Sequence, residues 1–361
     1  MHEPKKLEEM IIYLIICAGR KSETILPLVE ELAQKCKKIY VIPTDNTKKL
    51  FSIPKFKGLK NVQVINDYSN NIEEEDLVLV APCTFNTFNK MVLGIADNYA
   101  LSILAASIGK KKNIYLALSM NNALWQNPVI EKNLTCLDSN YISVIWPDEK
   151  ENGEKTMASF GKILDYIYVR FSRLKYPLKQ AKGSKENFEL INSNYKMLSK
   201  LGHKVFSNSF THADKGCIAL KVNNGFIVTT TGSCLGTLKK DDFSYIPLSK
   251  SKPLIHWIGK KKPSCETPMF YEIFRQMPEV KCIVHTHAKI ITLSKKFSAF
   301  STKQYIRYGL PKTGNAVVPL LKKHNFCILK DHGEIFVGKN PADCLKKIKN
   351  TVKDNLLNHL N

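Results

Sequence analysis

Apolar runs of strand length alternate with amphipathic stretches of helix length from residue 10 to residue 171. The apolar runs are IIYLIICAG, KIYVIPT, NVQVIN, DLVLVAP, NIYLALS and YISVIW. Near-continuous apolar strands separated by helices are typical of a parallel sheet that is covered on both faces. The pattern therefore predicts an α/β fold with a doubly wound parallel sheet.

The rhythm changes after residue 171. Residues 172–187 carry Pro and Gly and have no apolar period, which predicts a linker. NFELINSNYKMLSKLG then predicts a helix that ends at Gly202, and closely spaced strand candidates follow it: GCIALKV, GFIVTTTG, FSYIPL and LIHWIG. We expect a second α/β domain with a mainly antiparallel sheet flanked by helices. The predicted domains are 1–175 and 187–361, joined by a linker at 176–186.

Composition narrows the function classes without deciding among them. The chain has 361 residues, of which 44% are hydrophobic and 24% charged, and it has no apolar run of transmembrane length. The charged start MHEPKKLEEM and the short apolar run after it predict no signal peptide and a cytoplasmic protein. Ten cysteines without a C-x-x-C pair predict free thiols.

The formal net charge of +22 would suit a polyanionic partner. The lysines, however, stand in short clusters such as residues 110–112 and 260–262, without the interleaved aromatic residues of a nucleic-acid platform. We expect neither nucleic acid nor a membrane as a partner. A small anionic substrate, or a lysine-rich proteome, accounts for the charge.

Two loops of the first half carry hydroxyl and amide side chains directly after predicted strands. One contains Thr84, Asn86 and Thr87, and the other contains Met120 and Asn121. In doubly wound folds such loops lead into helix N-termini, where free N–H groups face anions. These side chains suit a phosphate or the edge of a flavin ring, because no formal charge is buried. Alternatively, the residues of the first loop only cap their helix.

Three stretches carry a family resemblance. Residues 82–87 read P-C-T-F-N-T against the pattern P-A-S-A-N-T, and residues 94–98 match G-I-A-D-N. Residues 118–125, LSMNNALW, are similar to P-x-M-N-x-x-M-W. The chain from about residue 10 to residue 170 thus resembles the homo-oligomeric flavin-containing cysteine decarboxylase family. The resemblance implies a homo-oligomer and bound FMN, with the FMN phosphate near Gly19, Ser22 and Thr44.

The chain departs from that family at the catalytic histidine. Counting back from Asp76 places Tyr68 there, and His2 is the only histidine before residue 203. Leu118 and Leu124 replace a proline and a methionine of the family motif. We therefore expect FMN binding without cysteine decarboxylation. A flavin-dependent redox step and a structural flavin both stay open.

The second half places His285 and His287 in the stretch VHTHA. Residues two apart on a strand face the same side, so both imidazoles could reach one metal ion, although a lone H-x-H also occurs in packed cores. His332 ends another strand candidate and is followed by Gly333, and Glu266 begins a helix upstream. Three neutral histidines around an open position can form a catalytic zinc site. The alternative ligands are His212, His256 and His324.

The chain from about residue 187 to residue 352 resembles the class II aldolase and adducin family. Where the family patterns are S-S-E, H-T-H and N-H-G, this chain reads S-C-E at 264–266, H-T-H at 285–287 and D-H-G at 331–333. The resemblance implies that the three histidines hold Zn²⁺, or another divalent ion, and that Glu266 is the catalytic acid and base. It also implies that the substrate phosphate is bound by Thr231, Gly232 and Ser264, although the family's G-N-x-S stretch is degraded to residues 216–219.

Together the two halves predict a bifunctional enzyme. An FMN-binding domain is fused to a metal-dependent lyase, a class II aldolase, for a small, phosphorylated, sugar-like substrate. In the alternative hypothesis, one or both halves are degenerate binding modules that assemble a complex without lyase activity. The complete set of three histidines and Glu266 favours the enzyme, because a scaffold has no need of that set.

Overall fold

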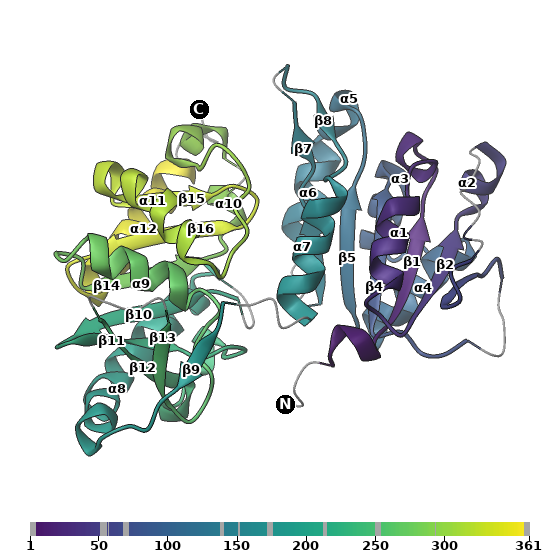
Figure 1. The fold of residues 1–361 in the computed structure, drawn as a ribbon. Helices are drawn as coiled ribbons and strands as arrows, with labels where there is room; N and C mark the ends of the chain where they lie inside the picture. The colour runs from purple at the N-terminus through teal and green to yellow at the C-terminus, as the bar shows by residue number, and fades with distance from the viewer. Residues whose placement is uncertain are drawn as a thin grey trace. The chain divides into compact units, whose positions relative to one another are not determined.

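The fold is taken from a computed structural model of the chain, drawn in Figure 1. The structure describes residues 5–50, 56, 58–67, 72–137, 141–150, 152–171, 176–211, 215–249, 254–292 and 294–356. The chain divides into two compact units, Met1–Leu174 and Lys175–Asn361. Within the described ranges, no helix is both long enough and apolar enough to cross a bilayer.

The first unit contains a six-stranded parallel sheet in the order β3-β2-β1-β4-β5-β6. The order runs outward in both directions from β1 and β4, so the sheet is doubly wound, as predicted. The strands are β1 (Ile11–Ile16), β2 (Lys38–Pro43), β3 (Val62–Val64), β4 (Leu77–Cys83), β5 (Asn113–Leu118) and β6 (Ile142–Ile145).

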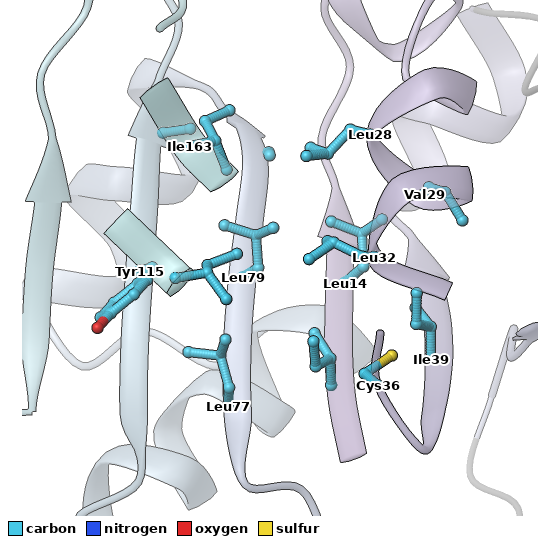
Figure 2. Close-up of a cluster of buried hydrophobic side chains, with 14 of the residues drawn as sticks. Leu14, Leu28, Val29, Leu32, Cys36, Ile39, Leu77, Leu79, Tyr115 and Ile163 are labelled. Carbon is cyan, nitrogen blue, oxygen red and sulfur yellow. The ribbon is translucent and has the colours of Figure 1, made fainter. Parts of the chain in front are cut away.

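Alternate residues of each central strand enter two separate cores. On β1, Ile12, Leu14 and Ile16 belong to one buried cluster, whereas Ile11 and Ile15 belong to the other. Figure 2 shows the first cluster, which α1 and α7 cover. The helices of this unit are α1 (Leu26–Ala33), α2 (Asp45–Leu50), α3 (Phe85–Val92), α4 (Tyr99–Gly109), α5 (Asn122–Trp125), α6 (Pro128–Cys136) and α7 (Phe160–Phe171). The strands are apolar on both faces because both faces are buried.

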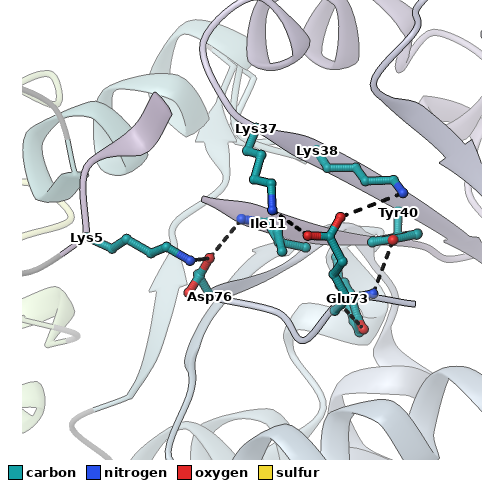
Figure 3. A network of polar contacts seen from close by, with 8 residues as sticks. Lys5, Ile11, Lys37, Lys38, Tyr40, Glu73 and Asp76 are labelled. Atoms are coloured by element: carbon teal, nitrogen blue, oxygen red, sulfur yellow. Dashed lines mark hydrogen bonds and ion pairs between the residues drawn. The ribbon is translucent and has the colours of Figure 1, made fainter. Parts of the chain in front are cut away.

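A polar network holds the amino-terminal edge of this sheet (Figure 3). Asp76 accepts hydrogen bonds from the backbone N–H of Ile11 at 2.9 Å and from Lys5 Nζ at 2.8 Å. Glu73 forms an ion pair with Lys37, and its backbone N–H donates to the hydroxyl of Tyr40 at 3.1 Å. This network lies at the opposite end of the strands from the predicted flavin loops, so we assign it a structural role.

The second unit contains an eight-stranded sheet in the order β15-β16-β14-β10-β11-β12-β13-β9. All neighbouring strands are antiparallel except β13 and β9, which confirms the mainly antiparallel sheet. The strands are β9 (Leu178–Gln180), β10 (Cys217–Val222), β11 (Gly225–Thr229), β12 (Phe243–Pro247), β13 (Ile255–Gly259), β14 (Cys282–Thr286), β15 (Phe326–Leu329) and β16 (Gly333–Gly338). A separate two-stranded sheet belongs to the first unit and consists of β7 (Asp148–Glu149) and β8 (Lys155–Thr156).

Helices cover both faces of the second sheet. α8 (Lys185–Ser207) and α12 (Pro341–Leu356) bury apolar residues in one cluster, and α9 (Thr267–Gln276) and α11 (Pro311–His324) bury theirs in another. The short α10 (Lys289–Thr292) follows β14 and packs near α12. Short 3₁₀ turns complete the list: Leu7–Glu9, Arg20–Ser22, Leu235–Thr237, Lys240–Asp242 and Lys295–Phe300.

Two sequence expectations need correction here. The helix predicted to end at Gly202 continues to Ser207, because this glycine serves close packing: a Cβ there would lie 2.6 Å from the carbonyl oxygen of Leu235. The predicted linker at 176–186 contains β9, which pairs with β13 and therefore belongs to the second sheet. A three-residue strand is too short to leave a recognisable apolar period.

Candidate functional site

The predicted flavin residues all follow the carboxyl ends of neighbouring strands. The four strands β2, β1, β4 and β5 lie side by side in the parallel sheet, so the loops after them meet at one edge. That edge includes the switch point between β1 and β4, where doubly wound folds bind ligands. The residues are Thr44 after β2, Gly19 and Ser22 after β1, Thr84, Asn86 and Thr87 after β4, and Met120 and Asn121 after β5.

The loop after β1 is held tightly against its neighbours. The backbone N–H of Cys17 donates to the carbonyl of Pro82 at 3.2 Å, which joins the β1 and β4 loops. Ser22 is fully buried, and its Oγ donates to the carbonyl of Gly19 at 2.7 Å. Thr44 Oγ1 lies 2.8 Å from Thr47 Oγ1. Hydroxyl groups thus shape these turns, which leaves the turn backbone as the surface for an anion.

The loops after β4 and β5 use their polar residues differently. Thr84 is the N-cap residue of α3, yet its side chain makes no capping hydrogen bond, and its Oγ1 instead lies 3.2 Å from Thr87 Oγ1. Asn86 is exposed. Asn121 does cap α5, because its Oδ1 accepts from the backbone N–H of Leu124 at 3.0 Å. Helix capping therefore accounts for Asn121 but not for Thr84.

In the second unit, the structure brings His285, His287 and His332 together. One ligand atom from each ring lies within 4.8 Å of the other two. The ring centroids are 4.5, 4.9 and 5.2 Å apart. His285 lies near the end of β14, His287 follows that strand, and His332 directly precedes β16, which pairs with β14. Neighbouring antiparallel strands thus supply all three imidazoles.

Two backbone features allow this convergence. Asp331, just before His332, has a φ of 62°, which reverses the chain between β15 and β16. A Cβ on Gly333 would lie 2.4 Å from the carbonyl oxygen of Thr286 and 3.0 Å from Cε1 of His285. Only glycine therefore lets the two strands approach closely enough for the rings to meet.

Burial keeps the imidazoles of His285 and His332 neutral. It lowers the pKa of His285 to about 4, and it also lowers the pKa of His332 below its ordinary value. His285 Nδ1 donates to the carbonyl of Glu334 at 2.9 Å, which leaves Nε2 as its ligand atom. His285 Nε2 and His332 Nδ1 are buried without a hydrogen-bond partner. Neutral rings with unpartnered nitrogens are the form that binds a metal ion.

Glu266 lies beside the histidines. Its side chain is buried, with Oε1 3.5 Å from His332 Nε2, and Oε2 has no hydrogen-bond partner. Burial raises the pKa of Glu266 to about 8, although a hydrogen bond from the backbone of Gly309 lowers it in part. A carboxyl group with a pKa near neutrality can both accept and donate a proton.

The predicted phosphate residues have fewer free donors than expected. Thr231 uses its Oγ1 to donate to the carbonyl of Pro263 at 2.8 Å, and its backbone N–H donates to Lys262 at 2.9 Å. Ser264 Oγ accepts from the backbone N–H of Glu266 at 3.3 Å and so keeps its own proton. Gly232 adopts a φ of 75° with open space around its Cα. Gly232 and Ser264 thus fit an anion better than Thr231 does.

The alternative histidines lie away from this cluster. His256 belongs to β13, and His324 ends α11 with its ring 4.4 Å from that of Phe300. His212 and Tyr68 lie outside the described residues. Within the described ranges, the candidate metal ligands that converge are His285, His287 and His332.

Comparison with known families confirms the family resemblance of each half of the chain. The family model Flavoprotein matches residues 1–172, and the model Class II Aldolase and Adducin N-terminal domain matches residues 196–353. The chain is a fusion of members of these two families. The flavoprotein domain contains the four loops at the sheet edge, and the aldolase-family domain contains the histidine cluster.

Three relatives match one domain each. The flavoprotein domain is 30% identical over 162 residues to a putative phosphopantothenoylcysteine decarboxylase of Dictyostelium discoideum, which covers 38% of this chain and 82% of the relative. The aldolase-family domain is 28% identical over 178 residues to 3-oxo-tetronate 4-phosphate decarboxylase of Pectobacterium atrosepticum, covering 43% and 79%. It is also 28% identical over 176 residues to L-fuculose phosphate aldolase of Methanococcus vannielii, covering 45% and 93%.

Sequence reasoning missed two contributors to the aldolase-family site. Glu334 is fully buried beside the cluster, and the backbone of Gly309 forms a hydrogen bond with Glu266. The ring of Tyr308 lies 4.8 Å from that of His332. The signal for Glu334 was present as a charged residue in the apolar strand GEIFVG, whereas nothing in the stretch QYIRYGL marks it as part of a site.

Proposed function

We propose that this chain is a bifunctional enzyme whose aldolase-family domain is a divalent-metal-dependent carbon–carbon lyase and whose flavoprotein domain binds FMN. The observation that carries the proposal is the convergence of three histidines, two of them kept neutral by burial, beside the buried carboxyl group of Glu266. A scaffold gains nothing from burying these groups, because each costs free energy unless a ligand compensates it.

The donor set fits a metal ion on its own chemistry. Two histidine nitrogens and one carboxylate oxygen are buried without partners, and no cationic side chain forms an ion pair with them among the described residues. The imidazoles of His285, His287 and His332 would hold a divalent ion such as Zn²⁺. When bound, the ion supplies Lewis-acid stabilisation of the negative charge that develops on the substrate oxygens.

Glu266 carries the proton in this proposal. Its Oε2 is free of protein partners, and the N–H of Gly309 fixes the orientation of the carboxyl group. In the direction of bond formation, the carboxylate removes a proton from the carbon beside the substrate carbonyl, that carbon adds to the carbon of an aldehyde, and the proton passes to the alkoxide that results. Cleavage runs through the same steps in reverse. His332, 3.5 Å away, holds the carboxyl close to the ligand set.

The substrate is proposed to be a small phosphorylated sugar or sugar acid. The names of two relatives, 3-oxo-tetronate 4-phosphate decarboxylase and L-fuculose phosphate aldolase, both include a phosphorylated sugar derivative. In this chain the donors for its phosphate would be the backbone at Gly232 and the hydroxyl of Ser264. The formal net charge of +22 also favours an anionic substrate.

FMN is proposed for the flavoprotein domain because four loops, whose predicted contact groups are uncharged, meet at the sheet edge that includes the switch point between β1 and β4. Thr84 supports this assignment, because it begins α3 without capping it and so leaves the first N–H groups of that helix for an anion. We further propose a homo-oligomer. Cysteine decarboxylation is not proposed, because the sequence carries Tyr68 where that chemistry uses a histidine.

Metal content and proton exchange together test the lyase. Each of the variants His285→Ala, His287→Ala and His332→Ala should lose the divalent ion, measured by elemental mass spectrometry. Glu266→Gln should retain the ion but lose about 10²–10⁴-fold in the rate at which solvent deuterium enters dihydroxyacetone phosphate, because an amide cannot carry the proton. Full metal retention in all three histidine variants would refute the lyase and favour the alternative of a binding or assembly module.

A further inference from the structure

Strand β16 contains a buried acid in an otherwise apolar sequence. Glu334 is 0% exposed and lies directly after Gly333, two residues after His332. Among the described residues, its side chain forms no ion pair with a lysine or an arginine. Its partners are hydroxyl groups and a backbone N–H instead. A buried carboxylate of this kind is costly unless hydrogen bonds stabilise it.

The hydrogen bonds of the Glu334 carboxylate go to the residues around His287. Oε2 accepts from Thr286 Oγ1 at 2.7 Å and from the backbone N–H of Ala288 at 3.0 Å. Oε1 accepts from the hydroxyl of Thr292 in α10. Thr286 and Ala288 are the chain neighbours of His287, so the carboxylate fixes the backbone on both sides of this ligand.

The backbone of Glu334 acts on a second ligand. Its carbonyl oxygen accepts from Nδ1 of His285 at 2.9 Å, which sets the tautomer and the ring orientation of that histidine. Glu334 is also the strand partner of Thr286 in the pairing of β16 with β14. Glu334 thus forms hydrogen bonds with the ring of His285 and with both chain neighbours of His287, and it follows His332 by two positions.

We propose that Glu334 is the positioning residue of the metal centre, holding the turn of His287 with its carboxylate and the ring of His285 with its carbonyl. This inference rests on the proposed metal site. It extends that proposal by naming the group that sets ligand geometry, a role that neither motif comparison nor the histidines themselves reveal. An apolar residue at this position would leave the backbone N–H of Ala288 and the hydroxyl of Thr286 buried without their acceptor.

Zinc affinity measures this role without turnover. Zn²⁺ alone is titrated into the metal-free full chain in competition with a chromophoric chelator. Glu334→Leu should weaken zinc binding by about 10–100-fold, the usual effect of removing a group that orients a metal ligand. Glu334→Gln should lose less, because its amide oxygen can still accept from Thr286 and Ala288 while its NH₂ faces the hydroxyl of Thr292.

Two further variants separate positioning from general stability. Thr286→Val removes one bond beside His287 and should weaken zinc binding to an intermediate degree. Ser244→Ala, on β12, removes a buried hydroxyl that donates to the carbonyl of Lys261 at 2.6 Å, and it should leave zinc affinity unchanged. Urea unfolding of the metal-free variants reports how much each substitution destabilises the fold.

The possible outcomes are distinct. If the wild-type chain binds zinc and Glu334→Leu binds it equally well, Glu334 only stabilises the fold and the inference fails while the metal site stands. If the wild-type chain binds no zinc, the proposed function fails first. If Glu334→Leu does not fold, Glu334→Gln and Thr286→Val decide: the d–d absorption bands of bound Co²⁺ should shift in both, and bands identical to wild type would overturn the inference.

Discussion

The two domains prepare their candidate sites by opposite means. In the flavoprotein domain, the predicted contacts are hydroxyl, amide, thioether and backbone groups, none of which titrates near neutral pH. In the aldolase-family domain, the candidate site contains three histidines and two buried glutamates. The first site is built from groups that cost little to bury, and the second from groups that are costly without a ligand.

The difference follows from the two kinds of sheet. A parallel sheet gathers the loops after all its strands at one edge, so a site forms there from loops and helix starts without side chains having to meet. The antiparallel pair β14 and β16 instead holds its ligands at the strand ends or one residue beyond them, where His285 is buried and His287 and His332 are partly buried. We therefore expect pH and metal removal to affect the second domain more than the first.

The largest expected effect is the pH dependence of the metal-free second domain. Glu266 has a folded pKa of about 8 against an ordinary value of 4.5, so between these values the folded state holds a proton that the unfolded state has released. The stability that the protonated group provides is full below about pH 4.5 and is lost as the pH rises through about 8. Glu266→Gln should not lose this stability, so at about pH 8.5 its free energy of unfolding should fall less than that of the wild type, by a few kcal/mol.

Urea unfolding of the metal-free chain at pH 5 and pH 8.5 measures this effect. The matched control is Glu279→Gln, because that glutamate is exposed in the same domain. Equal pH dependence of the wild type and Glu266→Gln would show that the carboxyl group is ionised at little cost, and the contrast between the two domains would weaken.

Gly333→Ala should come next in size. The added Cβ would meet the carbonyl oxygen of Thr286 at 2.4 Å, so β14 and β16 must move apart. Overpacking of this kind costs about 1–3 kcal/mol, and zinc affinity should fall with it because two ligand strands separate. Gly236→Ala would press only on the ring of Phe206, at 2.6 Å, and serves as a control for crowding away from the ligands. Unchanged zinc affinity in Gly333→Ala would contradict the packing argument.

Asn86→Ala should weaken FMN retention by about 1–3 kcal/mol, because a polar group of the flavin or of the bound substrate would lose its partner. The side chain is exposed in the free protein, so the fold itself should be unaffected. Flavin fluorescence during equilibrium dialysis measures the retention. If the wild-type chain fails to bind added FMN, the flavin proposal is refuted.

Gly19→Ala should produce the smallest effect. Its φ of −161° is open to any residue, and an added Cβ would lie 3.5 Å from Pro82 Cγ, an ordinary contact. We expect a change in the free energy of unfolding within about 0.5 kcal/mol. The comparison with Gly333→Ala then distinguishes a loop site that tolerates a side chain from a strand site that does not. A large loss of stability in Gly19→Ala would remove this distinction.

The sequence predicted what depends on local pattern. Buried parallel strands such as β1 and β4 have continuous apolar runs, and the H-x-H spacing at His285 follows from strand geometry alone. Contacts between distant segments were not predictable in this way. The hydrogen bond of Thr231 to Pro263 and that of Glu334 to Ala288 depend on how strands pair and where a turn folds back, and neither leaves a periodic signal.

Strand β9 has a further consequence for how the two domains can be separated. It pairs with β13 at the end of the second sheet, where Ala181 also donates its backbone N–H to the carbonyl of Trp257 at 2.8 Å. A fragment beginning at Lys185 would keep every helix and ligand of the second domain but expose the backbone of Ile255 and Trp257 as an unprotected edge. Exposed edges of this kind recruit strands from other molecules, so such a fragment should aggregate while one beginning before Leu178 stays monodisperse.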